Sequence, residues 1–402
     1  MSLNLNHEKA FSKQRKSWGE YYDILKDGQK KFQPFYRQMI QDVLCNEKND
    51  APVCSPACMT LWLAALAEMS SARTRKQILD AMGMKDTTSL SQTVDAMWEL
   101  ETRDEEEGIC RLSSSIWLNQ NRRCSEKKAL EKQFRMSHMD IFAGEMGSDS
   151  MNREIKNWLN ECTGGKLKDQ VSDISLSPEI QAVLFSAIYF KAGWEMIEFS
   201  EPREAVFHGE NRKGKCQMMK GKETLPYYRG DQFGAVSLDL TGLGRQIFFI
   251  LPDESSSINA VLKSSSFDEL LEQGEEYPDR EMAKIQLYLP QIKADAKINL
   301  IPYLEKEGIQ DAFDYKTADF SPLLELGNLP GPLYLSKADH CVHIEWDERG
   351  VEGAAYTMGQ YDCYGLPPSA LGKITFRLDR PFIYLIMGIH GTPLFVGAVR
   401  NI

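Results

Sequence analysis

At one place in the sequence, His340-Cys341-Val342-His343, several residues of types that could bind a metal lie close together. Structural zinc sites combine two such groups at a regular spacing, and this chain has no second Cys/His group that fits. The six histidines are scattered, so the sequence predicts no metal site and no cofactor. Taken alone, His340 is expected to be an ordinary hydrogen-bonded histidine.

Two short motifs resemble parts of enzyme active sites. Residues 209–215 spell Gly-x-x-x-x-Gly-Lys, but Cys216 stands where a phosphate-binding loop has Ser or Thr, and no strand precedes it. Ser125-x-x-Lys128 lacks the Lys-Thr-Gly motif that accompanies it in penicillin-recognising enzymes. No Gly-x-Ser-x-Gly motif occurs, and no nucleophile has a recognisable partner base. No catalytic residue is therefore predicted, and an enzyme is the least favoured interpretation.

The nine cysteines are spread along the whole chain, at positions 45, 54, 58, 110, 124, 162, 216, 341 and 363. There is no Cys-x-x-Cys pair, and a disulfide framework is not expected in a long chain without clustered cysteines. Most are predicted to be small buried apolar residues. Cys363 is the exception, because it falls in a segment expected to be exposed.

Composition excludes several classes of function. The chain has 402 residues and a net charge of −11, which argues against binding of nucleic acid because phosphate contacts need clustered Lys and Arg. No run of eighteen or more apolar residues occurs, so no membrane-spanning segment is expected. The first residues lack a basic segment followed by an apolar one, so no export signal is expected in this sequence.

The stretch 347–368 combines strand patterning with low strand stability. Small or β-branched residues recur with a period of two and alternate with larger or polar ones, which would place the two sets on opposite faces of a strand. The inward set is Val351, Gly353, Ala355, Thr357 and Gly359. So many small residues form a weak strand by themselves. Its second half contains Gly365 and ends at Pro367-Pro368, which predicts an exposed loop.

This stretch resembles the reactive-centre loop of the serpins, the serine protease inhibitor family. The family's hinge pattern corresponds to the run Glu348-Arg349-Gly350-Val351-Glu352-Gly353-Ala354-Ala355. In inhibitory members the bond that the protease cleaves usually follows the first Glu by sixteen residues, which implies cleavage at Tyr364-Gly365. The Pro-Pro pair that follows agrees with this count, and the whole loop is placed at about 348–368.

Other motifs extend the resemblance over roughly residues 30–402, with gaps. Ser55-Pro56 matches the family's helix start near the point where the main sheet parts, and Cys58 replaces the next Ser of that motif. The run Ala182–Phe190 continues to Trp194 and matches a central strand followed by the Trp near which the loop inserts. Ser186 replaces the family's Asn, and His340 matches a His of the polar cluster that holds the sheet closed. The resemblance therefore implies a sheet-opening region made of Ser55, Ser186, Trp194 and His340.

The implied architecture is an α+β serpin fold, with three β-sheets surrounded by eight or nine helices and an exposed reactive-centre loop. Residues 1–30 are expected to form a polar N-terminal extension, and residues 31–402 a single serpin domain. The pattern Ser55-Pro56 independently predicts a helix start, since Ser is a good N-cap and Pro suits the first helical position.

The implied function is inhibition of a serine protease by a suicide-substrate mechanism, with covalent trapping and insertion of the loop into the main sheet. Tyr364 favours chymotrypsin-like, elastase-like or subtilisin-like targets, because an apolar pocket accepts an aromatic side chain. The alternative is a non-inhibitory serpin that acts as a carrier or chaperone. Residues 104–107 are acidic where some family members bind heparin through a basic helix, so no heparin site is expected.

The other implied properties concern the protein's partners and its place in the cell. The protein is expected to be a monomer whose partner is the protease. An extracellular or cell-surface location is expected, with a cytoplasmic one as the alternative.

Overall fold

A computed structural model describes most of the chain. The described residues are 16–105, 108–119, 138–166, 168–172, 174–180, 182–242, 244–274, 277, 280–323, 334–335, 338–351 and 372–402. The predictions made above for Glu352, Gly353, Ala354, Ala355, Tyr364 and Gly365 lie outside these residues.

The helices within the described residues fall mainly in the first half of the chain. They are α1 (Trp18–Asn46), α2 (Pro56–Met69), α3 (Ala72–Ala81), α4 (Thr87–Glu101), α6 (Asp149–Cys162), α7 (Lys168–Val171), α8 (Ile258–Leu262), α9 (Ser265–Gln273) and α10 (Ile301–Lys306), with short 3-10 turns η3 (Asp311–Phe313), η4 (Ser321–Leu323) and η5 (Ile389–Gly391). The hydroxyl of Ser55 accepts a hydrogen bond from the Cys58 amide at the start of α2, so the predicted N-cap is present. Helix α1 runs across residues 30 and 31, where the sequence predicted a domain boundary.

One sheet has seven strands, in the order β11-β12-β13-β5-β3-β2, with β4 paired to β3. These strands are β2 (Arg103–Glu105), β3 (Gly108–Asn119), β4 (Met139–Gly144), β5 (Ala182–Gly193), β11 (Ile292–Asn299), β12 (Asp339–Asp347) and β13 (Gly350–Val351). Strand β13 is only two residues long, yet it is the element that links β12 to β5.

The second sheet has nine strands, in the order β1-β16-β15-β9-β8-β7-β10-β14, with β6 paired to β7. They are β1 (Val53–Cys54), β6 (Arg203–His208), β7 (Lys213–Arg229), β8 (Phe233–Leu240), β9 (Arg245–Pro252), β10 (Arg280–Pro290), β14 (Lys373–Arg377), β15 (Phe382–Met387) and β16 (Pro393–Val399). Every residue of β15 and of β16 is buried, so this hairpin forms part of the core.

The expected α+β serpin architecture is confirmed, but the strands form two hydrogen-bonded networks where three sheets were expected. The cause is β7, which has 17 residues and pairs with β6 at its start, with β10 along its middle and with β8 at its end. A strand this long joins two expected sheets into one continuous network.

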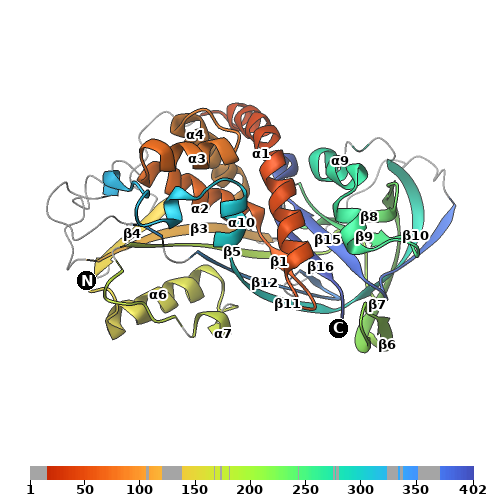
Figure 1. The fold of residues 1–402 in the computed structure, drawn as a ribbon. Coiled ribbons are helices and arrows are strands. Elements are labelled where there is room, and N and C mark those ends of the chain that lie inside the picture. The colour runs from red at the N-terminus through yellow and green to blue at the C-terminus, as the bar shows by residue number, and fades with distance from the viewer. Residues whose placement is uncertain are drawn as a thin grey trace.

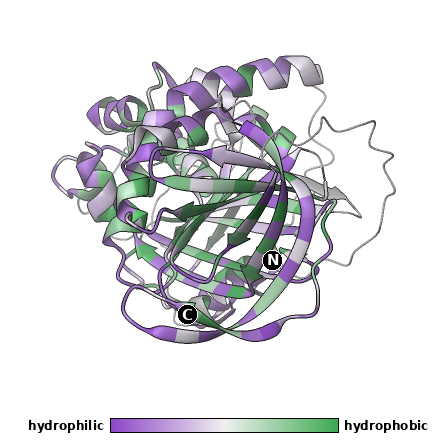
Figure 2. Cartoon of the chain, turned by 90° about the vertical axis from the view of Figure 1, so that its right-hand side faces the viewer, coloured by the Kyte–Doolittle hydropathy of each residue, from purple (hydrophilic) through white to green (hydrophobic). Residues whose placement is uncertain are grey.

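Helices cover both faces of the seven-stranded sheet (Figure 1). Helices α1 to α4 lie on one side of it, and α6 and α7 lie on the other. Hydrophobic residues lie mainly on the strands in the middle of the molecule, and hydrophilic residues make up much of the outer helices (Figure 2). Among the described helices, none combines the length and the apolar character needed to cross a bilayer.

A buried ion pair connects the helical layer to the nine-stranded sheet. Glu101, at the end of α4, lies 3.8 Å from the Arg245 Nε of β9, and the two side chains are 0% and 1% exposed. Arg245 also donates to the Glu101 carbonyl at 2.7 Å, and the Ile389 amide donates to the Glu101 carboxylate at 2.7 Å. Glu101 is thus bonded to two segments that lie far apart in the sequence.

Candidate functional site

The site is centred on the short strand β13, which begins the loop predicted from the sequence. Gly350 and Val351 pair antiparallel with Asp347 and Trp346 of β12 on one side. On the other side they pair antiparallel with Gly193 and Ala192 of β5. The first two residues of the segment after the hinge turn are therefore already part of the seven-stranded sheet.

The two residues of β13, Gly350 and Val351, lie in closely packed positions in the sheet interior. Val351 is 2% exposed and faces inward, as do its neighbours Trp346 and Ala192. A Cβ at Gly350 would stand 2.3 Å from the carbonyl oxygen of Ala192, which is far inside van der Waals contact. Only glycine fits there, because the backbones of β5 and β13 approach so closely.

Beyond β13 the strands β5 and β12 run parallel, and in the described residues no other strand lies between them. Neither strand has a bulge over this length, since β5 keeps one register with β3 and β12 keeps one register with β11. Counting back six residues on both strands from the pair Ala192 and Trp346 places Ser186 opposite His340. If β13 continued in the same register, its next residues would therefore lie between these two strands.

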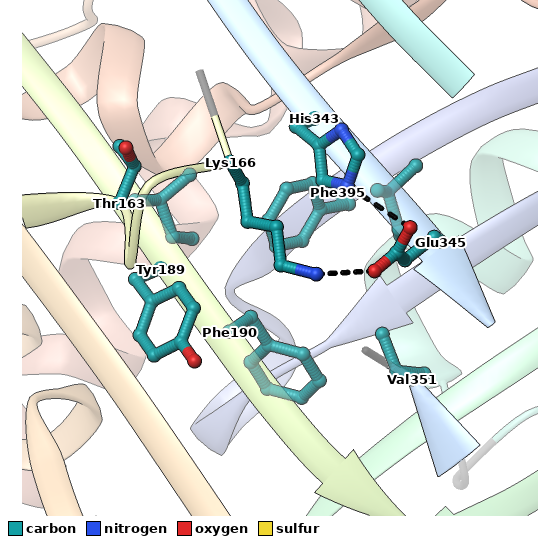
Figure 3. A pocket seen from close by; sticks show the side chains of 10 residues that line it. Thr163, Lys166, Tyr189, Phe190, His343, Glu345, Val351 and Phe395 are labelled. Atoms are coloured by element: carbon teal, nitrogen blue, oxygen red, sulfur yellow. Dashed lines mark hydrogen bonds and ion pairs between the residues drawn. The ribbon is translucent and has the colours of Figure 1, made fainter. Parts of the chain in front are cut away.

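A small pocket lies directly beyond Val351 in this position (Figure 3). Tyr189 and Phe190 of β5 line it on one side, and His343 and Glu345 of β12 on the other. Lys166, from the segment that follows α6, also lines the pocket. The path along which a lengthening β13 would extend is therefore partly hollow.

One ion pair crosses this path. The ammonium group of Lys166 bonds to the Glu345 carboxylate on β12, and both side chains are about one-third exposed, at 31% and 30%. The His343 Nε2 lies 3.6 Å from the same carboxylate, and its Nδ1 lies 2.6 Å from Asp295. Burial raises the pKa of Glu345, but the bond and charge of Lys166, with His343 and Lys293, outweigh it and lower that pKa below its ordinary value. The carboxylate is therefore held ionised, and it ties β12 to the segment after α6.

In the middle of the sheet, the residues assigned to the sheet-opening region lie close together around the start of α2. The Ser55 amide donates to His340 Nε2 at 2.9 Å. The Ser186 hydroxyl donates to the carbonyl of Cys58 at 3.3 Å. Both sheet residues are therefore bonded to the first turn of α2, and among the described residues no hydrogen bond joins Ser186 to His340 directly.

Burial determines the charge of this cluster. It lowers the pKa of His340 from 6.5 to about 4, so the imidazole is neutral at pH 7 and its Nε2 accepts the Ser55 bond. Burial likewise raises the pKa of the Cys58 thiol to about 12, so this cysteine is an unreactive apolar neighbour.

Trp194 lies at a different place, at the end of β5 beside the hinge. Its indole Nε1 donates to the Asp347 carbonyl at 2.9 Å, and its amide donates to the Arg349 carbonyl at 3.4 Å. Arg349 forms an exposed ion pair with Asp347 at 2.7 Å, and Gln291 donates to the Glu348 carboxylate at 2.8 Å. The turn between β12 and β13, residues 347–350, is thus held by Trp194, by the ion pair of Arg349 with Asp347 and by Gln291.

The sequence analysis did not include two residues that contact this site, Glu345 and Gln291. The partner of Glu345 is Lys166, which lies 179 residues away in the sequence. Such a pair is found only when the fold brings the two segments together.

The described geometry defines a class: an α+β protein whose seven-stranded sheet contains a two-residue strand, β13, between β5 and β12. Residues 32–402 match the profile of the family described as Serpin (serine protease inhibitor). The chain belongs to the serpin family.

Individual relatives agree with this assignment. The chain is 26% identical over 374 residues to a serine protease inhibitor of Cyanea capillata, an alignment that covers 88% of this chain and 93% of the relative. Its fold is similar to the native-state crystal structure of the thermophilic serpin tengpin, with a TM-score of 0.78, 23% identity and coverage of 98% and 96%. It is also similar to human thyroxine-binding globulin with thyroxine bound, with a TM-score of 0.75, 19% identity and coverage of 95% and 99%. At these identities the two structures bear on the fold alone.

Proposed function

We propose that this protein inhibits serine proteases as a suicide substrate, with Tyr364-Gly365 as the bond that the protease attacks. One observation carries the proposal: Gly350 and Val351 already pair with both β5 and β12, at the place where an inserted strand would begin. If the loop served only to bind a partner, its first residues would not need to pair with a strand on each side.

The strand registers predict where the rest of the loop would go. If β13 lengthens without a bulge, each loop residue takes the place between one residue of β5 and one of β12. The inward positions then are Gly353 between Phe190 and Ile344, Ala355 between Ile188 and Val342, and Thr357 between Ser186 and His340. Small or hydroxyl-bearing side chains suit this interior, and a charge would not.

The outward positions follow from the same registers. Glu352 would lie between Lys191 and Glu345, beside the ammonium group of Lys166. Tyr356 would lie between Ala187 and Cys341, on the face of the sheet that α6 and α7 cover. The alternation that the sequence shows is therefore the one that this insertion requires.

The chemistry would be that of the protease up to the acyl-enzyme. The serine oxygen of the protease attacks the carbonyl carbon of Tyr364, the C–N bond to Gly365 breaks, and the new amine takes a proton from the general acid of the protease. The product is an ester between the protease and Tyr364. The cut removes the constraint on the loop, which inserts before the ester hydrolyses and carries the protease with it.

The force for this step would come from the intact fold itself. A strand inserted between β5 and β12 would pair with both of them along its length, as Gly350 and Val351 do at its start, and this added pairing would favour the inserted state. The intact protein would then be kept in its state by kinetics until the loop is cut.

Incubation with chymotrypsin followed by denaturing electrophoresis tests the proposal. We expect an adduct that survives denaturation, together with a C-terminal peptide that mass spectrometry shows to begin at Gly365. The variant Tyr364→Arg should lose the adduct with chymotrypsin and gain one with trypsin. Complete cleavage of the loop without any adduct would contradict the proposal.

A non-inhibitory carrier remains the second candidate, favoured by the similarity to thyroxine-binding globulin solved with thyroxine. The two functions differ in what cleavage does to stability. The melting temperature should rise after cleavage within 352–368 if the loop inserts, whereas equal melting temperatures before and after cleavage would favour the carrier.

A further inference from the structure

Three side chains that could bind a metal ion lie together where α4 meets the start of β4, away from the insertion site. They are Asp95 and Glu99 of α4 and His138, the residue before β4. One ligand atom from each lies within 4.8 Å of the others, and Asp95 Oδ1 stands 2.7 Å from His138 Nε2. The cluster joins two segments 43 residues apart, which is why no sequence motif indicated it.

Local structure holds these side chains in place before any ion arrives. Asp95 and Glu99 are four residues apart on a helix and therefore lie on the same face. The ring of His138 stacks on Trp98 with centroids 3.9 Å apart and planes inclined by 8°. Its side chain is 2% exposed, so the imidazole has little freedom to turn away. A ligand set fixed in this way loses little entropy when it binds.

The two carboxylates of this cluster lie close together. Two carboxylates at positions i and i+4 repel each other. Within the described part of the chain, no lysine or arginine forms an ion pair with either, and Asp95 has His138 as its partner. A bound dication would neutralise both carboxylates.

We propose that Asp95, Glu99 and His138 bind one first-row divalent cation, for which Zn²⁺ is the suitable probe. One imidazole nitrogen and two carboxylate oxygens form a mixed set that suits Zn²⁺ with water in the remaining position. Mg²⁺ prefers oxygen ligands alone and keeps most of its water, so it is the natural negative control. Ligand atoms of one such ion lie about 3–3.5 Å apart. A bound ion would therefore replace the Asp95–His138 hydrogen bond and bring the three ligand atoms, which lie within 4.8 Å of one another, to that spacing.

Such an ion would connect the helical layer to the edge of the main sheet. Strand β4 pairs with β3 alone, and α4 packs above that end of the sheet (Figure 1). The ion would cross-link α4 to β4 in the folded chain, and it would stabilise that state because the unfolded chain does not hold the three ligands together.

The test uses the full chain, stripped with a chelator and kept reduced. Isothermal titration with ZnCl₂ should give one site per chain, and thermal unfolding should show a melting temperature that rises by a few degrees and saturates. MgCl₂ at the same concentrations should leave the melting temperature unchanged. In the variant Glu99→Gln the Zn²⁺ affinity should fall by at least about tenfold.

Two comparisons keep the result interpretable. Glu269→Gln removes an exposed carboxylate from α9 and should bind Zn²⁺ as the parent protein does. Co²⁺ in place of Zn²⁺ should give visible absorption of a nitrogen and oxygen site without thiolate charge-transfer bands, which excludes binding by the cysteines. Equal Zn²⁺ affinity in Glu99→Gln and the parent, thiolate bands with Co²⁺, or no binding at millimolar Zn²⁺ would each overturn the proposal.

Discussion

An arginine at position 357 should convert the inhibitor into a substrate. The registers of β5 and β12 direct this position into the sheet interior between Ser186 and His340. His340 is 5% exposed and, because burial lowers its pKa to about 4, it is neutral there. An arginine that arrives between these side chains finds no counter-charge, since their hydrogen bonds are made to the start of α2.

The size of the effect can be worked out from this environment. A buried charge without a partner costs on the order of 4 kcal/mol. If about half of that cost is present in the transition state for insertion, the barrier rises by ~2 kcal/mol and insertion slows roughly 30-fold. Hydrolysis of the acyl-enzyme is unaffected, so most encounters should end in a cut loop and an active protease.

The assay is the number of inhibitor molecules consumed per protease trapped, measured by titrating chymotrypsin activity. Thr357→Arg should raise this number by about tenfold or more. Glu352→Arg is the matched control, because position 352 would lie on the opposite face between Lys191 and Glu345, whose side chains are partly exposed, so the same charge there should leave the stoichiometry near that of the parent. If the two variants behave alike, the register extrapolated from Val351 is wrong.

Three further predictions concern the contacts described around the site and the core. Lys166→Met should remove the ion pair with Glu345, a partly exposed pair that contributes about 0.5–1 kcal/mol, and should accelerate adduct formation a few-fold. An unchanged rate would show that this ion pair does not resist the separation of β5 from β12. Burial lowers the pKa of His340 from 6.5 to about 4, so the unfolded state takes up a proton at a higher pH than the folded state does. The free energy of unfolding should therefore be intact above pH 6.5 and should fall by about 2 kcal/mol by pH 5. His340→Gln should flatten this part of the pH profile of thermal unfolding. Arg245→Leu should leave the Glu101 carboxylate buried without its cation and cost roughly 3–5 kcal/mol in denaturant unfolding, whereas a loss below about 1 kcal/mol would mean that water reaches it.

The parts of this structure that could be predicted from sequence are those written in consecutive residues. Ser55 and Pro56 predict the start of α2, because capping depends on residues next to one another in the chain. Trp194 and His340 could be assigned from motifs within a few residues of each.

The remaining parts depend on distances that the sequence does not contain. The fusion of two expected sheets follows from the full length of β7 and from its pairing with β6, β10 and β8, and the pairing with β10 joins residues far apart in the sequence. The tie between Lys166 and Glu345 and the cluster of Asp95 with His138 join residues 179 and 43 positions apart. Only the packing of α6 and α4 against the sheet brings these pairs together.

The two ends of the loop are anchored in different sheets, and this decides what becomes of the molecule after it is cut. The N-terminal end leaves from β13 in the seven-stranded sheet, and the chain returns through β14 in the nine-stranded one. The piece from Gly365 onward contains β14, β15 and β16, of which the last two are buried throughout and pair with β9 and β1. A severed backbone would therefore yield a stable dimer of unequal fragments, a large one and a peptide of the last residues held only by noncovalent contacts. Size-exclusion chromatography would report a single species where a denaturing gel resolves two.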